Sequence, residues 1–527
     1  MGKLRSKNAK EIKAYFVGGG IASLAGAAFL IRDGHMPGKN IHIFEELKVA
    51  GGALDASGDP EKGYVFRGGR MLNNPVYEST WNLFESIPSL SDPTKTIRDD
   101  VLKFNADIVS PAKARLIDEN GEVVYVSTLG FNNLDRLALG KLAITPEETL
   151  GTTKIEELFS HDFFKTNFWY MWATTFAFQP WHSAVEFKRY MLRFMHEFSR
   201  LDSLIGVTRT TYNQYDSVIL PLKKWLEEHG VNFVMNTVVT DLDFKSSNPE
   251  EKTVERIYCI SNGLEKEIEI RDDDLVFVTN GSMVESSSLG SMTTAPKLKK
   301  KGSSWKLWEN IAKKKPDMGN PEPFADHIDG SKWVSFTMTF NDTEFFDSFQ
   351  NFTGRAAATL KDSNWFLTYV LPYQPHYINQ PDNVKVGWGY GLSVDQKGNY
   401  VDKKMSDCNG EEILTELMCN LQMQDKLPSL LKTTTCIPCM MPYITAHFMP
   451  RIGADRPHVI PQGSTNLAFI GQYCEVPGDV TFTVEYSVRS AQMAVYGLLD
   501  LDKIVTPINK HQYDVRVIMN SLMESFK

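Results

Sequence analysis

The alternation of apolar and polar residues near the start of the chain predicts a strand, a glycine turn, a helix and a second strand. An apolar run at residues 14–17 ends in the glycines at 18–20, and an Ala-rich stretch at 21–32 follows. A second apolar run at 41–44 ends in Glu45. Because this βαβ order opens dinucleotide-binding domains, we expect an α/β fold with a parallel sheet.

Later segments repeat this alternation and predict that the chain returns to the same domain. Residues 217–229 predict an amphipathic helix that ends at Gly230, and residues 231–235 predict a strand. Residues 274–282 predict a strand that enters a glycine turn, and 466–499 predict a strand, a glycine turn and a helix. We therefore expect one domain that is assembled from segments far apart in the sequence.

The remaining segments predict a second domain and a tail. Aromatic residues concentrate at 163–183, where their spacing indicates helical core and their density also suits the wall of an apolar pocket. The Lys-, Ser- and Pro-rich stretch 293–323 predicts an exposed excursion, and 510–527 predicts an amphipathic tail helix. The expected division is a dinucleotide-binding domain at 1–100, 211–292 and 436–499, a substrate domain at 101–210 and 293–435, and a helical tail at 500–527.

Composition narrows the class of function. At 527 residues the chain is long enough for two or three domains. The net charge of −9 argues against nucleic acid as a partner, because phosphate binding needs a concentrated basic surface. Scattered cysteines indicate a reducing, cytoplasmic compartment, and the CxxC pair Cys436 and Cys439 lacks the further ligands of a metal site. The apolar runs are too short to cross a membrane, which leaves a peripheral membrane contact.

Residue types in the first turn indicate which dinucleotide binds there. Gly18, Gly20 and Ser23 give the spacing GxGxxS, whose glycines allow a tight turn and a close approach of a diphosphate to the helix N-terminus. Glu45 can accept hydrogen bonds from both ribose hydroxyls, which disfavours a 2′-phosphate. The "GGALD" stretch at 51–55 is typical of flavin-binding proteins, so we expect FAD.

A set of stretches, in order and over nearly the whole chain, carries a further likeness. They are "GGGIASLAGAAFLIRDG", "FEELKVAGGALDASGD", "GYVFRGGR", "FAFQPWHSAVEFKRYMLRFMHEF", "RTTYNQYDSVILPLKKWL", "VTNGSM", "MPYITAHFMPR" and "GQYCEVPGDVTFTVEYSVRSAQMAVYGLL". In them the chain resembles the flavin-containing oleate hydratases, also called myosin-cross-reactive antigens. The resemblance implies a two-dinucleotide-binding, glutathione-reductase-type FAD domain with an inserted α+β substrate domain.

The resemblance also implies the reaction. Members of that family add water across the cis double bond at carbon 9 of oleic acid and related unsaturated fatty acids, giving 10-hydroxy acids without net redox change. They require FAD, and the reduced form, FADH2, is the more active. Protonating an alkene builds positive charge, so the pocket must supply a proton donor, a positioned water and negative potential. A monomer or a homodimer is expected.

The resemblance assigns roles to individual residues. Tyr212 falls on the family's proton donor, and an ordinary pocket-lining tyrosine is the competing interpretation. Gln214 and Tyr215 are expected to contact the substrate. Thr445 and His447 are expected to hold its carboxylate, although His447 suits a satisfied buried histidine equally well. The implied flavin contacts are Gly18, Gly20, Ile21, Ala22, Ser23, Glu45, Glu46, Gly51, Gly52, Arg70, Val239, Asn280, Asp479 and Thr483. We expect no metal site.

Met71 departs from the family's pattern. Most members carry a water-activating glutamate directly after Gly-Gly-Arg, and a thioether cannot accept a proton from water. A subset of the family resembles this chain in having Met and an Asn pair, and there Asn73 or Asn74 would orient the water while Met71 packs beside the flavin or the alkene. We favour this interpretation over a double-bond isomerase and over a degenerate fatty-acid binder. A true FAD oxidoreductase, such as an amine oxidase relative, is the remaining alternative.

Overall fold

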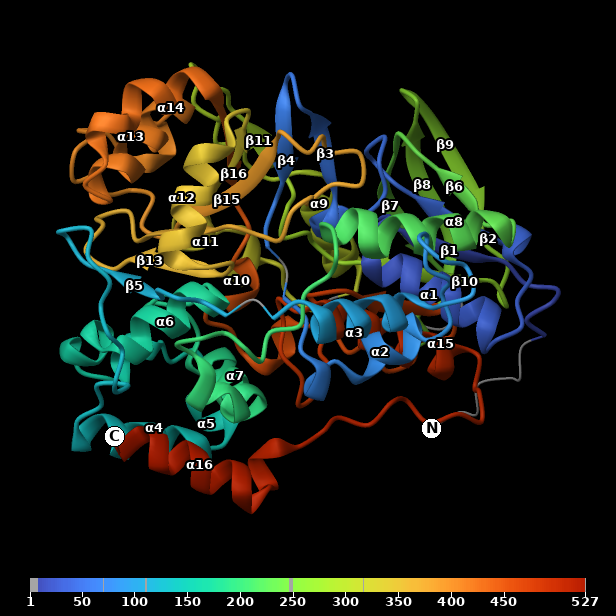
Figure 1. Cartoon of the computed structure of the whole chain (residues 1–527). Coiled ribbons are helices and arrows are strands. Elements are labelled where there is room, and N and C mark those ends of the chain that lie inside the picture. The colour runs from blue at the N-terminus through green and yellow to red at the C-terminus, as the bar shows by residue number, and fades with distance from the viewer. Residues whose placement is uncertain (1–7, 70, 110, 246–249, 316, 527) are drawn as a thin grey trace.

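A parallel sheet forms one layer of the molecule (Figure 1). The computed structural model describes residues 8–69, 71–109, 111–245, 250–315 and 317–526. Neighbouring strands of this sheet all run parallel, so their carboxyl ends meet at one edge. The strands, in spatial order, are β17 (Leu467–Ile470), β10 (Leu275–Thr279), β1 (Ala14–Val17), β2 (Ile41–Phe44) and β6 (Asn232–Val234).

Apolar residues explain why this layer forms. Strand β1 is buried at every position, as expected for a parallel strand that is covered on both faces. Helices α1 (Ile21–Arg32) and α15 (Val484–Leu498) pack against each other and against the sheet. The order β1, α1, β2 and the late pair β17, α15 confirm the predicted βαβ opening and the return of the chain to this domain.

The structure also contains smaller antiparallel sheets. One pairs β3 (Ala56–Asp59) with β4 (Gly63–Phe66), and the other contains β7 (Thr237–Phe244), β8 (Val254–Ser261) and β9 (Leu264–Glu269). Helix α9 (Ser303–Lys314) packs on β7. The prediction of an exposed excursion is wrong for α9, because the helix turns Trp305, Leu307, Trp308 and Ile311 inward. Lys306 and Lys313 stay exposed, whereas Lys314 pairs with Asp241 and Asp243 of β7.

A larger, mainly antiparallel sheet forms the second layer. Strand β12 (Trp333–Phe340) is buried at every position, and aromatic side chains of β12 and β15 (Lys385–Gly391) lie in the core beneath it. Helices α12 (Thr343–Thr353), α13 (Gly410–Asn420) and α14 (Leu427–Thr433) pack against its strands. The strand order is β11 (Ser288–Leu289), β16 (Thr434–Met441), β12 (Trp333–Phe340), β15 (Lys385–Gly391), β14 (Leu367–Val370), β13 (Ala357–Leu360) and β5 (Leu116–Ile117).

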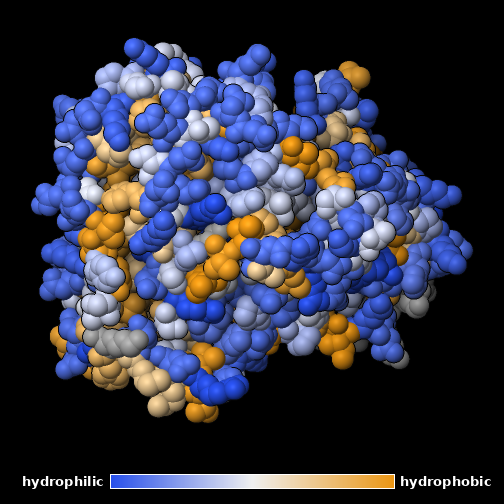
Figure 2. Space-filling view, in the orientation of Figure 1, coloured by the Kyte–Doolittle hydropathy of each residue, from blue (hydrophilic) through white to orange (hydrophobic). Residues whose placement is uncertain are grey.

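The other helices complete the molecule, and α16 packs on the 3₁₀ segment Met195–Arg200, as predicted for the tail. Apolar side chains gather at the lower edge in Figure 2, over α4 and α16, where Leu134, Leu137, Met519 and Met523 are exposed. Across the described residues, every helix is too short or too polar to pass through a membrane. These helices are α2 (Glu78–Phe84), α3 (Ile97–Asp107), α4 (Asn133–Ile144), α5 (Glu147–Leu150), α6 (Asn167–Phe176), α7 (Ala184–Phe194), α8 (Leu220–Glu228), α10 (Glu322–Ala325), α11 (Ile328–Ser331) and α16 (Val515–Phe526).

Candidate functional site

A cavity of about 500 Å³ lies at the carboxyl ends of β1, β2 and β10. Helix α1 begins at its wall, with Gly20 as the N-cap. Gly18 has a φ of +93°, which a residue with a side chain rarely adopts. A Cβ atom on Gly52 would lie 3.2 Å from the Cα of Gly20. Backbone rather than side chain therefore lines this end, so a diphosphate could reach the N–H groups of the helix N-terminus.

Glu45 places a carboxylate at the end of β2. Its side chain accepts hydrogen bonds from the backbone N–H groups of Gly19 at 2.7 Å and Leu47 at 2.9 Å. Burial raises the pKa of Glu45, although these hydrogen bonds oppose the rise. The carboxylate is thus held beside the glycine turn, where it can accept hydrogen bonds from ribose hydroxyls.

Glu285 brings another carboxylate to this cavity. The backbone N–H of Ser304 donates to it at 3.1 Å, and Ser303 donates a hydrogen bond to Glu46 on the same wall. Burial raises the pKa of Glu285 to about 7. The electrostatic potential of the cavity therefore changes near neutral pH.

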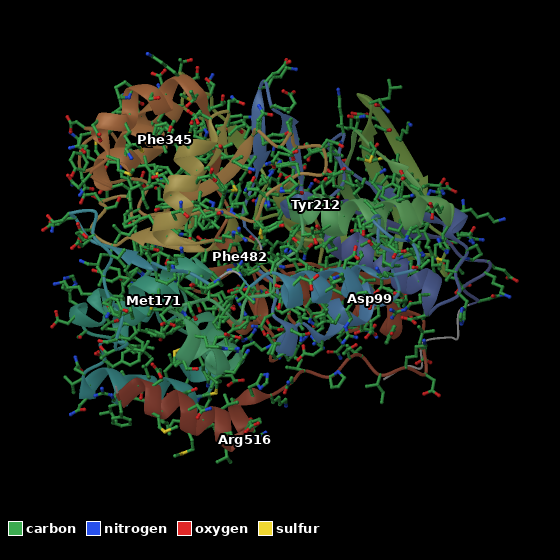
Figure 3. The ribbon with its side chains drawn as sticks, viewed as in Figure 1. Asp99, Met171, Tyr212, Phe345, Phe482 and Arg516 are labelled. Carbon is green, nitrogen blue, oxygen red and sulfur yellow. The ribbon has the colours of Figure 1, made fainter. Side chains whose placement is uncertain are left out.

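Phe482, labelled near the centre of Figure 3, lines this cavity and two others. It has a φ of +69°, and its ring stacks on His447 at a centroid distance of 4.8 Å. The next residue, Thr483, is the N-cap of α15, and its hydroxyl accepts a hydrogen bond from the N–H of Tyr486 at 3.1 Å. A second helix N-terminus is thereby fixed beside the cavities.

The second cavity, of about 140 Å³, is lined mostly by apolar and aromatic side chains. Arg209 and Arg355 are the cationic residues among the described lining. Burial lowers the pKa of Arg209 to about 10, which still leaves it protonated at neutral pH. This arrangement suits a long apolar ligand with one anionic end. The apolar part of the lining includes Phe66, Met71, Phe104, Leu204, Trp333, Tyr373, Trp388 and Tyr390.

The third cavity, of about 90 Å³, adjoins the second. The residues that line both, and so form their common wall, are Gly69, Met71, Thr175, Leu204 and Phe482. Asn73 and Glu197 line the third cavity, and Nδ2 of Asn73 donates to Oε1 of Glu197 at 2.9 Å. The polar residues Asn73 and Glu197 therefore lie next to the apolar second cavity, which we call the apolar channel.

Comparison with known proteins identifies the family. The profile of the MCRA family matches residues 11–496. The chain belongs to the MCRA family. It is 41% identical over 527 residues to the oleate hydratase of Streptococcus pyogenes serotype M49 (strain NZ131), covering 96% of this chain and 88% of the relative. It is 35% identical over 563 residues to the linoleate hydratase of Lactiplantibacillus plantarum, covering 98% of each.

Solved structures show that this MCRA protein shares its fold with a wider group. Cyclohexylamine oxidase from Brevibacterium oxydans IH-35A matches with a TM-score of 0.53 and 13% identity, covering 93% of this chain and 99% of that one. At this identity the likeness concerns the fold alone. It confirms the predicted fold class, an α/β dinucleotide-binding domain of the flavoprotein type with an added substrate domain and a C-terminal helix.

The structure brings most of the expected flavin contacts of the MCRA chain to the first cavity. Ser23, Gly51, Asn280 and Asp479 are not among its described lining residues. Asp479 instead forms an ion pair with Arg489 at 2.8 Å, as a residue that stabilises α15 would. Arg70 lies outside the described residues. Those in the lining are Gly18, Gly20, Ile21, Ala22, Glu45, Glu46, Gly52, Val239 and Thr483.

Met71, Asn73 and Asn74 have different surroundings in the structure. Met71 lines both smaller cavities, and Asn73 is buried in the third. Asn74 is exposed, and its backbone carbonyl accepts a hydrogen bond from Trp81 at 3.1 Å. Of the two amides in this MCRA sequence, Asn73 is thus the one that could orient a water molecule in a cavity.

Tyr212 lies in a tight turn at the edge of the second cavity. Thr210 and Asn213 line that cavity, whereas Tyr212 itself is half-buried and is not among the described lining residues. Its backbone N–H donates to Ser217 at 3.1 Å, and its carbonyl accepts from Thr210 at 2.6 Å. The turn therefore holds Tyr212 close to the cavity without placing it in the wall.

Only some of the residues expected to contact the substrate line a cavity. Gln214 lines the second cavity, but Tyr215, Thr445 and His447 are absent from the described lining of all three cavities. The hydroxyl of Thr445 donates to the carbonyl of Ser331 at 3.0 Å, and His447 is buried against Phe482. Their surroundings are those of packed interior residues.

Sequence reasoning missed Arg209, Glu197 and Glu285. Arg209 is the first residue of the stretch that holds Tyr212, so its position three residues before the proposed proton donor was a usable signal. Glu197 lies in one of the stretches that carry the family likeness, but neither it nor Glu285 shows from the sequence that it lines a cavity, because those positions depend on contacts with distant segments.

Proposed function

We propose that this protein is a fatty acid hydratase that adds water to the cis-9 double bond of oleic acid and related unsaturated fatty acids to give 10-hydroxy acids. The observation that carries this proposal is the likeness to two hydratases over 96% and 98% of the chain. The apolar channel beside a dinucleotide cavity supports it, because a long hydrocarbon needs such a lining. No net redox change accompanies the reaction.

We propose FAD as the cofactor, with the reduced form FADH2 as the active one. The glycine turn at Gly18 and Gly20, the carboxylate of Glu45 and the N-terminus of α15 at Thr483 fit its diphosphate, ribose and ring system. When bound, the reduced flavin supplies negative charge beside the channel, which would stabilise a developing cation.

Side chains in and around the apolar channel are proposed to divide the chemistry between them. Tyr212 is proposed to donate a proton to one alkene carbon, and Asn73 to orient the water that attacks the other carbon. Arg209 is proposed to hold the carboxylate, since it is a cation in an apolar lining, whereas Thr445 already donates its hydroxyl to Ser331. The aromatic walls exclude bulk water from the remainder of the channel.

The proposed setting is cytoplasmic, for a monomer or a homodimer. All six cysteines are free thiols, which suits a reducing compartment. The exposed apolar side chains of α4 and α16 support a peripheral membrane contact through which substrate could be taken up.

The test is a reaction of the purified protein with FAD, a reductant and oleate in ¹⁸O-labelled water, followed by mass spectrometry. A hydroxy acid that carries the label is expected. Recovery of a positional isomer without added oxygen would instead favour a double-bond isomerase, which the loss of the carboxylate at Met71 makes the second candidate. Bleaching of oxidised flavin by oleate would favour an oxidoreductase, and unchanged oleate with saturable binding would leave a fatty-acid binder.

A further inference from the structure

The third cavity holds a carboxylate that the family's pattern does not assign. Among the described residues that line it, Glu197 is the one acidic side chain, and Met71 lies in the same wall. The cavity has about 90 Å³ of space, and one water needs about 10–15 Å³ of such space, so several waters fit beside Glu197.

Several groups hold the Glu197 carboxylate in place. Asn73 donates to it at 2.9 Å, Arg200 donates at 2.8 Å, and Nε2 of His196 lies 3.2 Å from it. Burial raises the pKa of Glu197, but the hydrogen bonds from His196 and Asn73 and the charge of Arg200 outweigh burial, so the pKa lies below its usual value. Glu197 is therefore ionised at neutral pH.

Structural stabilisation explains this carboxylate poorly. Arg200 is partly exposed, and an ion pair with an exposed partner contributes little to stability. Burying a charged carboxylate beside an apolar cavity is costly. A Cβ on Gly206 would lie only 2.0 Å from Oε2 of Glu197, so the glycine leaves the space that the Glu197 carboxylate occupies. These features suit a group that is kept for its chemistry.

We propose that Glu197 takes the role of the carboxylate that most relatives carry at position 71. The inference rests on the proposed hydratase function. As one alkene carbon takes a proton from Tyr212, the oxygen of a water in the third cavity bonds to the other carbon, and Glu197 accepts the proton that this water releases. The net change is addition of H and OH, no electrons are exchanged, and solvent returns the proton to Tyr212.

The deciding experiment compares Glu197→Gln with Glu197→Gln/Met71→Glu. The single variant is expected to lose about 100-fold or more in turnover, the usual contribution of a general base, while its flavin absorbance and oleate affinity stay unchanged. The double variant is expected to recover at least about tenfold, because it restores a carboxylate on the shared wall. Asp202→Asn, which removes a nearby exposed carboxylate, is the matched control and is expected to keep full turnover.

Each outcome bears on the inference separately from the proposed function. If the wild-type protein forms no hydroxy acid, the proposed function fails. If it does and Glu197→Gln turns over at the wild-type rate, only the role of Glu197 fails. If both variants lose oleate binding as well as turnover, Glu197 has a structural role and the inference is overturned. If Glu197→Gln does not fold, Glu197→Asp tests the same point. This variant keeps the charge but shortens the side chain, so it is expected to lose about tenfold in turnover.

Discussion

Position 71 determines how far the family's mechanism applies to this chain. Its thioether lies in the wall between the second and third cavities. The resemblance implies a carboxylate at this position in most family members. The sequence reveals the missing group, but it does not reveal the nearby Glu197. Asn73 and Glu197 are 124 residues apart in the chain and meet only through the fold. Cavity contacts of this kind depend on tertiary packing, which local spacing does not encode.

At the residue scale, Tyr212→Phe is expected to lower turnover about 100-fold, because the phenol is the proposed acid. The flavin spectrum should stay unchanged, since Tyr212 is not among the described residues lining the first cavity. Steady-state formation of hydroxy acid, measured beside Tyr215→Phe as the control, checks this. Near-normal turnover would exclude Tyr212 from the mechanism.

Arg209→Met is expected to weaken oleate binding by about 10- to 100-fold, corresponding to the 1.5–3 kcal/mol of a hydrogen bond to a charged group. Methyl oleate has no charge to lose, so its affinity should hardly change. Titration of both ligands by protein fluorescence measures the difference. If Thr445 instead holds the carboxylate, Thr445→Val would selectively lose affinity for oleate and Arg209→Met would not.

At the element scale, the sequence predicted those parts of the fold that local patterns encode. The strand, glycine turn and helix around α1 follow from glycine positions and from apolar runs. Helix α9 was missed, because its flanking lysines obscured an apolar face with helical spacing. The order of the second sheet was also beyond prediction, since β12 pairs with β16 and β5 pairs with β13 across long stretches of the chain.

The segment that follows β10 leads to a prediction about pH. Glu285 has a pKa of about 7 in a cavity proposed to bind an anionic dinucleotide. A bound anion raises that pKa further, so binding takes up a proton, and the affinity for FAD falls as the pH rises through 7. For a rise of about one unit the loss is about tenfold. Isothermal titration between pH 6 and pH 8.5 measures it, and Glu285→Gln should bind FAD with no such step.

At the scale of the whole molecule, a buried ion-pair network joins α7 to the chain that follows the second sheet. Glu186 lies 3.0 Å from Arg451 and 3.0 Å from Arg456, and all three side chains are buried. Glu475 pairs with Arg451 at 3.1 Å and extends the network. Glu186 lies in α7, and its partners lie far along the chain. The network therefore links α7 to the segment that leads from the second sheet back to the first.

Glu186→Gln should therefore lower the free energy of unfolding by about 3–5 kcal/mol, because it removes one of the two carboxylates that face the buried Arg451 and Arg456. Glu147→Gln is the matched control: its carboxylate pairs with Arg189 at a partly exposed site, so the loss should stay below about 1 kcal/mol. Denaturant unfolding of both variants measures the difference, and equal losses would contradict the proposed importance of burial.

The ion pairs of Glu186 with Arg451 and Arg456 also make the stability of the fold sensitive to acid. Burial raises the pKa of Glu186, but the charges of Arg456, Arg451 and Arg189 outweigh burial and lower it to about 2. A carboxyl group with a depressed pKa stabilises the fold fully above its usual pKa of 4.5, and that contribution is lost as the pH falls from 4.5 towards 2. Wild-type stability should thus decrease over this range more steeply than that of Glu186→Gln, whose amide does not titrate. Parallel curves for the two proteins, measured by thermal unfolding at each pH, would show that the contact contributes nothing to acid sensitivity.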